Sequence, residues 1–424
     1  MPRIIESVEH KQTFLAACCE VTSWAVGTTP NGVVQLIARS GKSAWTSFGG
    51  ANAALIAILT FGMWLSPARA QAPSANPGPV RVVSPEVGLD GRVTFRLSAP
   101  DAREVLVSGE FMAGSKPLEK DAKGVWSVTI GPIEPEIYYY NFTIDGVHSI
   151  DPGNPEVKTG STPGTIQSVL EVRGDSAAFY DGRNVPHGEI RTHWYQSKSL
   201  NSMRRLTVYV PPGYDGSAGR LPVLYLLHGA NADETAWTRL GRVNLILDNM
   251  IADGKIKPFI VVMPFGYGVM PGARGGQGQN TELFSRDLRE DVIPYVDSRY
   301  RALADRDHRA IIGLSMGGGE SLSIGLNHLE LFGYVGGFSA AIGNTAGFAK
   351  TYSGLVADPA ATNAKLHLLW ISCGREDSLF GAAKNFSDFL AEKNIKHIFW
   401  ETSGAHTWMV WRRCLYQVSP MLFQ

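Results

Sequence analysis

The stretch AIIGLSMGGG, residues 310–319, decides the fold of the larger part of this chain. An apolar run over residues 310–314 leads directly into the pattern Gly-x-Ser-x-Gly at residues 313–317. The run is typical of a parallel strand that is covered on both faces. The glycines suit a sharp turn from that strand into a helix beginning near Gly318, and such a turn exposes a serine hydroxyl. We therefore predict a strand–turn–helix unit with Ser315 as a nucleophile.

Other apolar runs surround this unit and extend the same pattern. They occupy residues 206–210, 221–227, 259–263 and 366–372, and helical periodicity appears between them at 243–252 and 284–295. Alternating strands and helices over more than two hundred residues indicate a doubly wound α/β sheet. The sequence therefore predicts an α/β-hydrolase domain over residues 201–424.

A candidate acid and a candidate base follow the serine in the order that an α/β-hydrolase requires. Asp377 lies in the loop after the strand at 366–372, with neighbouring Glu376 as the alternative acid. His406 lies on a glycine-containing loop after a last strand at 398–401, and it is the one of ten histidines that follows both serine and acid in this way. The alternative role for His406 is to cap the next helix. The preferred prediction is a Ser315–His406–Asp377 triad, in which the histidine activates the serine and the aspartate orients the histidine.

Two backbone N–H groups are expected to stabilise the oxyanion that such a triad would generate. One belongs to Met316, directly after the serine, and we assign the other to Ala230, in the loop that follows His228 and Gly229. The chemistry requires no cofactor. The sequence shows neither a Cys-x-x-Cys motif nor a metal-ligand cluster, so we predict no metal.

The first 79 residues have the composition of a targeting segment and a linker. A 13-residue apolar run, Ala53 to Leu65, is short for a transmembrane helix. Basic Arg39 and Lys42 precede the run, and an Ala-x-Ala site ends at Ala70, as in a secretory signal peptide. We predict a signal at about 39–70 with cleavage near Ala70, a start codon assigned too far upstream, and a linker at 71–79. The protein would then be secreted or periplasmic, without stable membrane insertion; the alternative is a membrane anchor with a cytoplasmic tail.

Residues 80–172 alternate with the period of two that is typical of strands. Strands are expected at 93–97, 104–108, 126–130 and 138–144, with a turn at Asp145-Gly146. Short strands at this spacing predict a small immunoglobulin-like β-sandwich, joined to the hydrolase domain by a connecting segment at 173–200.

Charge and cysteine content narrow the function classes. Lys+Arg and Asp+Glu both number 39, so nothing favours a nucleic-acid partner. Of the four cysteines, Cys18 and Cys19 precede the predicted signal peptide. Cys373 and Cys414 could form one disulfide in an oxidising compartment or remain two buried thiols.

The motifs together resemble a known family. LPVLYLLHG (221–229), DETAW (233–237), GLSMGG (313–318), CGREDSL (373–379) and GAHTWMVWRR (404–413) are similar to the esterase D family of bacterial esterases. Within it, the similarity is greatest to feruloyl esterases of carbohydrate esterase family 1. This resemblance implies a Ser315, Asp377 and His406 triad, in agreement with the order of the motifs. Many relatives carry extra glycines after the His-Gly pair, whereas Ala230 follows here, which weakens the assignment of the second oxyanion donor.

Residues 80–172 resemble the early-set domain found before bacterial esterases and glycogen-branching enzymes. In some relatives this domain binds carbohydrate through exposed aromatic side chains. Trp126 and the tyrosines at 138–140 are the candidates here, although at period two about half of these rings must face a core.

The resemblance implies an acyl ester or acylated oligosaccharide as substrate, such as feruloyl or acetyl xylan. We expect Trp237 and Trp408 to bind it. Trp408 and Trp411 could line an aromatic acyl pocket that suits a ferulate, or they could be core anchors of the last helix. Competing functions are an enterochelin-type or other small-ester esterase, or a non-catalytic carbohydrate-binding protein. An intact serine, aspartate and histidine set argues against the last.

Overall fold

A computed structural model of the chain describes residues 26–28, 34–36, 82–158, 166–269, 276–343 and 345–424. The chain divides into two units, Met1–Ala75 and Asn76–Gln424. In the first unit, β1 (Val26–Thr28) and β2 (Val34–Leu36) pair in antiparallel fashion. The predicted signal peptide at 39–70, Cys18 and Cys19 lie outside the described residues. Among the residues that are described, no helix has the length and apolar character needed to cross a membrane.

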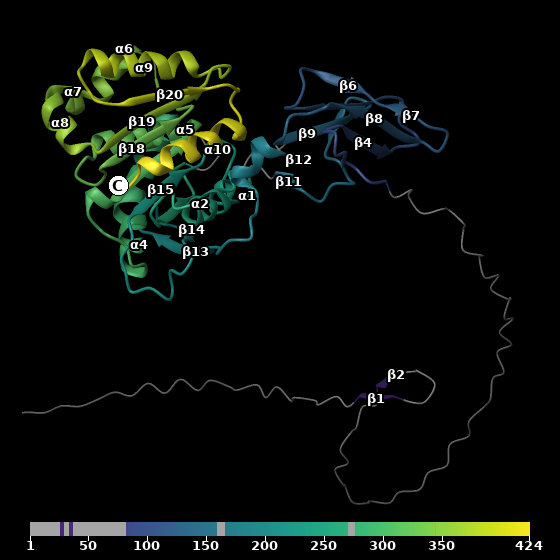
Figure 1. Cartoon of the computed structure of the whole chain (residues 1–424), viewed down its shortest axis with the longest axis horizontal. Coiled ribbons are helices and arrows are strands. Elements are labelled where there is room, and N and C mark those ends of the chain that lie inside the picture. Colours follow the sequence, from purple (N-terminus) through teal and green to yellow (C-terminus); the bar gives the residue numbers. More distant parts are fainter. Residues whose placement is uncertain (1–25, 29–33, 37–81, 159–165, 270–275, 344) are drawn as a thin grey trace, which may run out of the picture. The chain divides into compact units, whose positions relative to one another are not determined.

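An eight-stranded sheet forms the centre of the second unit, in the order β13-β14-β16-β15-β17-β18-β19-β20 (Figure 1). From β15 to β20 the neighbouring strands are parallel, whereas β13 and β14 add an antiparallel edge. This confirms the predicted doubly wound α/β-hydrolase sheet. The strands are β13 (Glu189–Ser197), β14 (Ser202–Val210), β15 (Val223–Leu227), β16 (Ile260–Pro264), β17 (Arg309–Leu314), β18 (Tyr334–Phe338), β19 (Leu368–Gly374) and β20 (Ile398–Thr402).

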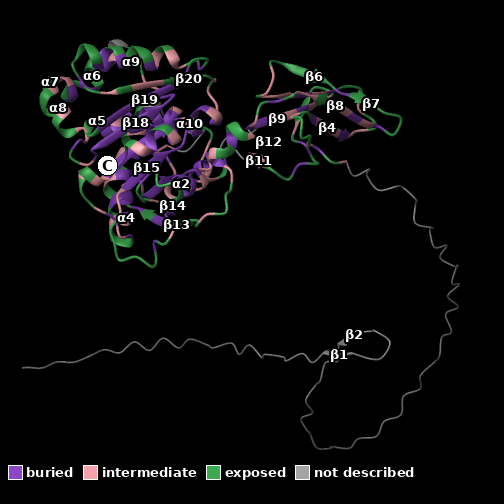
Figure 2. Cartoon of the chain, viewed as in Figure 1, coloured by how far each residue is buried: buried purple, intermediate pink, exposed green. Residues whose placement is uncertain are grey.

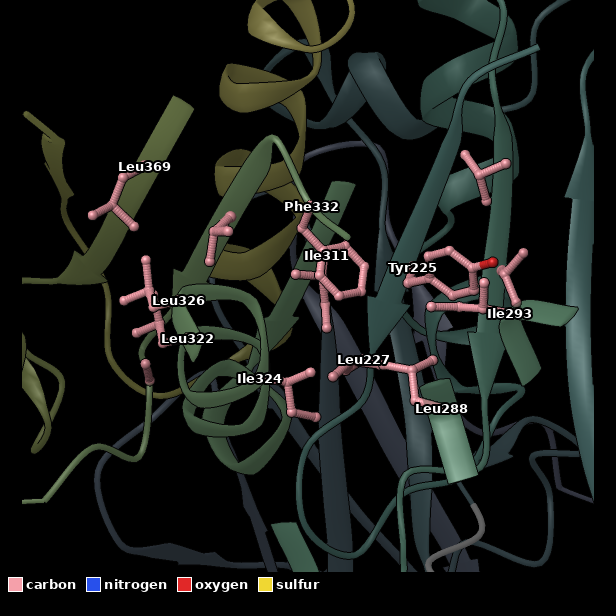
Figure 3. Packing of buried hydrophobic residues seen from close by; sticks show 14 of the residues in the cluster. Tyr225, Leu227, Leu288, Ile293, Ile311, Leu322, Ile324, Leu326, Phe332 and Leu369 are labelled. Atoms are coloured by element: carbon pink, nitrogen blue, oxygen red, sulfur yellow. The ribbon is translucent and has the colours of Figure 1, made fainter. Parts of the chain in front are cut away.

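Helices cover both faces of this sheet, so the central strands are buried on both sides (Figure 2). Along β15, Tyr225 and Leu227 enter one hydrophobic cluster, and Leu224 and Leu226 enter the other. Figure 3 shows side chains of the first cluster, among them Tyr225 and Leu227 of β15, Ile311 of β17, and Leu322, Ile324 and Leu326 of the helix after β17. The helices are α1 (Ala236–Arg239), α2 (Val243–Ala252), α3 (Gln277–Asp287), α4 (Ile293–Arg299), α5 (Ser315–Asn327), α6 (Thr345–Thr351), α7 (Ser353–Ala357), α8 (Pro359–Lys365), α9 (Phe380–Glu392) and α10 (Trp408–Val418).

Two strands of the sheet, β13 and β18, were not predicted from the sequence. β13 lies within residues 173–200, the predicted connecting segment, yet it pairs with β14 along its whole length. As an edge strand it is largely exposed and has no continuous apolar run. β18 has the sequence YVGGF, in which two glycines dilute the apolar signal. The helical pattern at 284–295 crosses three elements, α3, a π-helical turn at Leu288–Val292 and α4.

Two antiparallel sheets precede the hydrolase sheet and enclose their own core. One has the order β11-β12-β9-β5-β6 with β10 paired to β9, and the other has the order β3-β4-β8-β7. Asp145 and Gly146 both have positive φ, 47° and 86°, and form the predicted turn between β9 and β10. The strands are β3 (Glu86–Val87), β4 (Val93–Ser98), β5 (Val105–Gly109), β6 (Ser115–Pro117), β7 (Glu119–Lys120), β8 (Val125–Ile130), β9 (Glu136–Ile144), β10 (Val147–Ser149), β11 (Val157–Lys158) and β12 (Gln167–Val172).

The aromatic residues named as candidates for binding carbohydrate are all buried. Trp126 is 7% exposed, and Tyr138, Tyr139 and Tyr140 are 6%, 4% and 0% exposed. Trp126, Tyr138 and Tyr140 pack in the core of the sandwich, whereas Tyr139 joins a cluster of the hydrolase domain. The interpretation of these rings as an exposed sugar-binding surface is therefore wrong, because neither face of β9 is open to solvent at these residues.

A buried ion pair fastens the sandwich to the hydrolase domain. Glu136, at the start of β9, pairs with Arg412 of α10, and the two side chains are 3% and 0% exposed. Tyr180 donates its hydroxyl hydrogen to the same Glu136 oxygen, and Arg412 also donates to the carbonyl of Leu240. A charge removed from water in this way requires its partner, because an unpaired buried charge is costly.

Replacing Arg412 with Met should therefore destabilise the protein strongly. The substitution leaves the Glu136 carboxylate buried without its cation, and we expect a loss of about 3–5 kcal/mol in the free energy of unfolding. Urea unfolding followed by tryptophan fluorescence measures this loss. Arg413→Met, one residue along α10 on a half-buried side chain, is the matched control. An equal effect of the two substitutions would show that the ion pair does not hold the domains together.

Candidate active site

Ser315 lies at the junction between β17 and α5. Leu314 ends the strand, Ser315 is the first residue of the helix, and its φ is +53°. A positive φ is uncommon for a residue with a side chain and strains the backbone. This sharp turn holds the hydroxyl at the N-terminal end of α5, where the helix dipole favours negative charge. The helix begins at Ser315 itself, slightly earlier than the predicted start near Gly318.

The two glycines of the motif permit a close approach of neighbouring chain segments. A Cβ atom on Gly317 would lie 2.3 Å from the carbonyl oxygen of His228, and one on Gly313 would lie 2.2 Å from the carbonyl oxygen of Gly317. Both distances are far inside van der Waals contact. The pattern therefore reflects packing of the Ser315 turn against the end of β15, as well as its backbone conformation.

The structure brings the three residues of the predicted triad together from three loops. His406 Nε2 lies 2.9 Å from Ser315 Oγ, and His406 Nδ1 lies 2.8 Å from Asp377 Oδ2. The Asp377 side chain is fully buried, whereas that of His406 is 35% exposed. A hydroxyl, an imidazole and a carboxylate in this sequence of contacts can move a proton from serine to histidine.

Burial alone would raise the pKa of Asp377. Hydrogen bonds from His406 and from the backbone N–H of Leu379 outweigh that effect and hold the pKa below its usual value. The carboxylate therefore stays ionised and accepts a hydrogen from His406 Nδ1. With Nδ1 donating to the carboxylate, Nε2 is the ring nitrogen that faces Ser315.

The neighbouring acid, Glu376, occupies a different position. Its side chain is exposed, and it accepts a hydrogen bond from the backbone N–H of Gly404 in the histidine loop. Glu376 thus supports the loop that carries His406, and Asp377 is the carboxylate that pairs with the imidazole.

His228 fixes the loop after β15. The ring is 1% exposed, with Nδ1 2.8 Å from the carbonyl oxygen of Gly229 and Nε2 2.9 Å from the backbone nitrogen of Gly266. A carbonyl only accepts and an N–H only donates, so Nδ1 carries the hydrogen and the ring is neutral. Burial lowers the pKa of His228, which favours the same neutral form.

The backbone N–H of Asn231, further along the same loop, already has a hydrogen-bond partner. Asn231 has a positive φ of 59°, and its N–H donates to the hydroxyl of Tyr267. Ala230, which precedes it, is exposed. This geometry leaves Ala230 and Gly229 as the positions from which the loop can direct a backbone donor toward Ser315.

A cavity of about 350 Å³ opens above Ser315 and His406. Two larger hollows of about 580 and 670 Å³ elsewhere in the described structure contain none of the three triad residues. The smaller cavity is therefore the candidate substrate site. Its lining combines Gly229, Ala230, Asn231, Ala232, Leu314, Ser315, His406, Trp408 and Trp411 with Asn141, Lys158 and Gln167.

The three tryptophans near this cavity have different positions. Trp408 and Trp411 both line it, and the Trp411 ring lies edge-on to His406 with 4.9 Å between centroids. Both side chains also belong to the hydrophobic core, so lining and anchoring are not exclusive alternatives. Trp237 is 1% exposed, does not line the cavity, and packs behind Trp408 with centroids 5.2 Å apart. Trp237 thus supports Trp408 instead of reaching a substrate directly.

The sequence analysis missed one wall of the cavity. Asn141, Lys158 and Gln167 come from the sandwich, and no pattern along the chain indicates that they reach Ser315. Their proximity depends on how the sandwich packs against α10, which no local periodicity encodes.

Cys373 and Cys414 are not joined by a disulfide in the described part of the chain. Both cysteines are free and buried, so of the two alternatives, one disulfide or two buried thiols, the structure has the buried thiols. Burial raises the pKa of each thiol to about 12. Within the described ranges, no group of three or more His, Cys, Asp or Glu side chains could hold a metal ion.

The strand-to-helix serine, its histidine and a buried aspartate on an eight-stranded sheet are the arrangement of an α/β-hydrolase site. The model of the esterase family, described as "Putative esterase", matches residues 197–422. The chain belongs to this family.

Two named proteins are similar to this chain in sequence. An endo-1,4-beta-xylanase/feruloyl esterase of Xylanibacter ruminicola is 37% identical over 349 residues, which cover 80% of this chain and 46% of the relative. Endo-1,4-beta-xylanase Y of Acetivibrio thermocellus is 31% identical over 146 residues, 32% of this chain and 13% of that protein. The chain thus spans less than half the length of these curated relatives.

Solved structures show the same fold. A ferulic acid esterase aligns with a TM-score of 0.50 and 28% identity, covering 56% of this chain and 98% of that structure. The enterochelin esterase of Shigella flexneri aligns with a TM-score of 0.62 and 17% identity, covering 80% of this chain and 94% of that structure. At that identity the second likeness concerns the fold alone.

Proposed function

We propose that this protein hydrolyses carboxylic esters with Ser315 as nucleophile, His406 as general base and acid, and Asp377 as the group that orients the histidine. The observation that carries the proposal is the continuous chain of contacts, 2.9 Å from Ser315 Oγ to His406 and 2.8 Å from His406 to Asp377. The strained turn at Ser315 and the adjoining cavity supply exposure of the nucleophile and room for an ester.

In the first half of the reaction, His406 takes the hydroxyl hydrogen while Ser315 Oγ attacks the ester carbonyl carbon. Asp377 stabilises the resulting imidazolium. The backbone N–H groups of Met316 and Ala230 stabilise the oxyanion, and each such donor lowers the barrier by about 3–4 kcal/mol. The C–O bond then breaks, and His406 returns the proton to the departing alcohol, leaving the acyl group on Ser315.

In the second half, His406 takes a proton from water, and the oxygen of that water attacks the acyl carbon. Collapse of the second oxyanion releases the carboxylic acid, and Ser315 regains its hydrogen from His406. No cofactor enters either half of the reaction.

The proposed substrates are acyl esters of plant polysaccharides, such as feruloyl or acetyl xylan. Support comes from the xylanase/feruloyl esterase of Xylanibacter ruminicola, which matches 80% of this chain. The aromatic walls formed by Trp408 and Trp411 suit an aromatic acyl group. The partly exposed His406 side chain at the cavity leaves room for a large alcohol.

A panel of esters tests the substrate class. We expect the mature protein to hydrolyse p-nitrophenyl acetate, and to prefer methyl ferulate or acetylated xylan by kcat/KM. Enterochelin belongs in the same panel, because an enterochelin esterase shares the fold over most of the chain. Preference for that ester would redirect the proposal to small siderophore esters. Absence of turnover on every ester would overturn it.

We also propose that the protein is secreted or periplasmic, on the strength of the basic, apolar and Ala-x-Ala segments within residues 39–70. Sequencing the N-terminus of the exported protein should find Gln71. A chain that remains in the cytoplasm uncut would contradict this.

A further inference from the structure

Three polar side chains of the sandwich form a single row across neighbouring strands. Lys158 of β11 is the register partner of Gln167 of β12. The pairing of β12 with β9 sets Ser168 opposite Tyr140, so the same register continues to Gln167 opposite Asn141. Residues that lie opposite each other point to the same face of a sheet. We call Asn141, Gln167 and Lys158 the sandwich row, and all three line the cavity above Ser315.

The face that carries the sandwich row is the one that packs on the hydrolase domain. Ile137 and Tyr139 share that face of β9 with Asn141, because alternate residues of a strand point the same way. Both are buried in the cluster that contains Trp408 and Trp411. The row is therefore anchored beside the candidate active site by the same packing that holds the two domains together.

Polar contacts secure the strands on either side of the row. Arg239 of α1 donates to the carbonyl of Val157, directly before Lys158, at 2.9 Å. Arg242 pairs with Glu171 of β12 at 2.5 Å. Together with the buried Arg412–Glu136 pair, these contacts fix the sandwich row on a rigid support, which a specific binding site needs.

The sandwich row presents unused hydrogen-bonding capacity. Asn141 Oδ1 is buried and has no partner among the described residues. The Lys158 ammonium lies 4.6 Å from the centre of the Tyr139 ring, and no described residue forms an ion pair or hydrogen bond with it. Burial lowers the pKa of Lys158 while nearby Glu110 opposes that effect. Partly buried donors and acceptors of this kind gain most when a ligand satisfies them.

We propose that the sandwich row is part of the substrate-binding site and binds the sugar alcohol of the ester, with Lys158 donating to its oxygens. The inference rests on the proposed function of Ser315 and deepens it. One ammonium and two carboxamides provide several donors and two acceptors, which match sugar hydroxyl groups, since each hydroxyl both donates and accepts. Trp408 and Trp411 supply the apolar walls of the same cavity. The sandwich thus acts as a specificity element of the esterase.

Lys158→Met and Gln167→Leu test this role. We expect each to lower kcat/KM for an acetylated or feruloylated xylo-oligosaccharide about 10-fold, mainly through KM, because one hydrogen bond to the substrate is lost. Turnover of p-nitrophenyl acetate and methyl ferulate, which lack the sugar, should fall much less than turnover of the sugar ester. Lys158→Arg should restore most of the activity on the sugar ester, since it keeps a cationic donor.

Lys116→Met is the matched control. Lys116 is an exposed lysine on β6, at the opposite edge of the same sheet, and its loss should change neither class of ester. An equal loss on methyl ferulate and on the sugar ester would assign the row to the acyl group and overturn the proposal. Unchanged kinetics on the sugar ester in Lys158→Met and Gln167→Leu would overturn it as well.

A binding measurement separates this proposal from the proposed function. Calorimetric titration of the feruloylated oligosaccharide into Ser315→Ala reports binding without turnover. Adding Lys158→Met to that background should weaken binding about 10-fold. Equal binding with and without Lys158→Met would refute the role of the row, whereas absence of ester hydrolysis by the unmodified protein would refute the esterase itself.

Discussion

Ser315→Ala is expected to lower kcat by about 10⁵- to 10⁶-fold while KM changes little. The substitution removes the atom that attacks the carbonyl, and removal of the serine from a comparable triad has an effect of this size. The cavity and the oxyanion loop stay in place, so substrate binding should persist. Steady-state hydrolysis of p-nitrophenyl acetate and methyl ferulate measures the loss.

Ser323→Ala provides the control for that experiment. Ser323 lies on the same helix, α5, with a half-buried side chain. It makes no contact with His406 in the described structure. Its replacement should leave kcat within about twofold, because substitutions away from a site have small effects. If Ser315→Ala retained a tenth or more of the activity, another nucleophile would have to be sought.

Asp377→Asn is expected to lower kcat by about 10⁴-fold, the effect of the equivalent change in serine proteases. An amide can still contact His406 Nδ1, but it can donate a hydrogen to the ring and so stabilise the tautomer whose Nε2 cannot accept from Ser315. It also removes the negative charge that stabilises the imidazolium. Glu376→Gln, at the exposed neighbour, should lower kcat by less than about 10-fold, since Glu376 bonds to the backbone of the histidine loop and not to the imidazole.

The same carboxylate links stability to pH. Because the pKa of Asp377 is lowered in the folded protein, its ionised form contributes stability above the pKa of the unfolded chain. That contribution should disappear as the pH falls through the lower, folded-state pKa. Asp377→Asn should lack this part of the acid dependence, as thermal unfolding between about pH 2 and pH 6 would show. An unchanged dependence would mean that Asp377 does not titrate with a lowered pKa.

The sequence predicts the triad well because its signals are local. Each member follows a short apolar strand, and the carboxyl ends of parallel strands meet at one edge of a sheet. Ser315, Asp377 and His406 are separated by tens of residues, yet the order of strands is enough to expect them at one site. Glycines around Ser315 strengthen the signal because the backbone there admits no Cβ.

Other parts of the fold leave weaker traces in the sequence. β18 contains two glycines, and β13 is an edge strand with exposed side chains, so neither has the apolar run of a central strand. Trp237 was expected to bind the substrate because it is a large aromatic residue near a motif, but it is buried behind Trp408. The sandwich row is a product of packing between domains, and pairings of that kind depend on surfaces that only the folded chain defines.

The measurement that tests the central claim most directly is the capture of the acyl group on the protein. Mixing the protein with excess p-nitrophenyl acetate, quenching in acid and digesting it should yield one peptide that carries an added acetyl group at Ser315. The same treatment of Ser315→Ala should leave that peptide unmodified, and His406→Ala should acquire the label far more slowly than the unmodified protein, because His406 removes the Ser315 proton before the attack. Acetylation of a different residue in step with turnover, or turnover with no acetylated serine even under rapid quenching, would contradict the account.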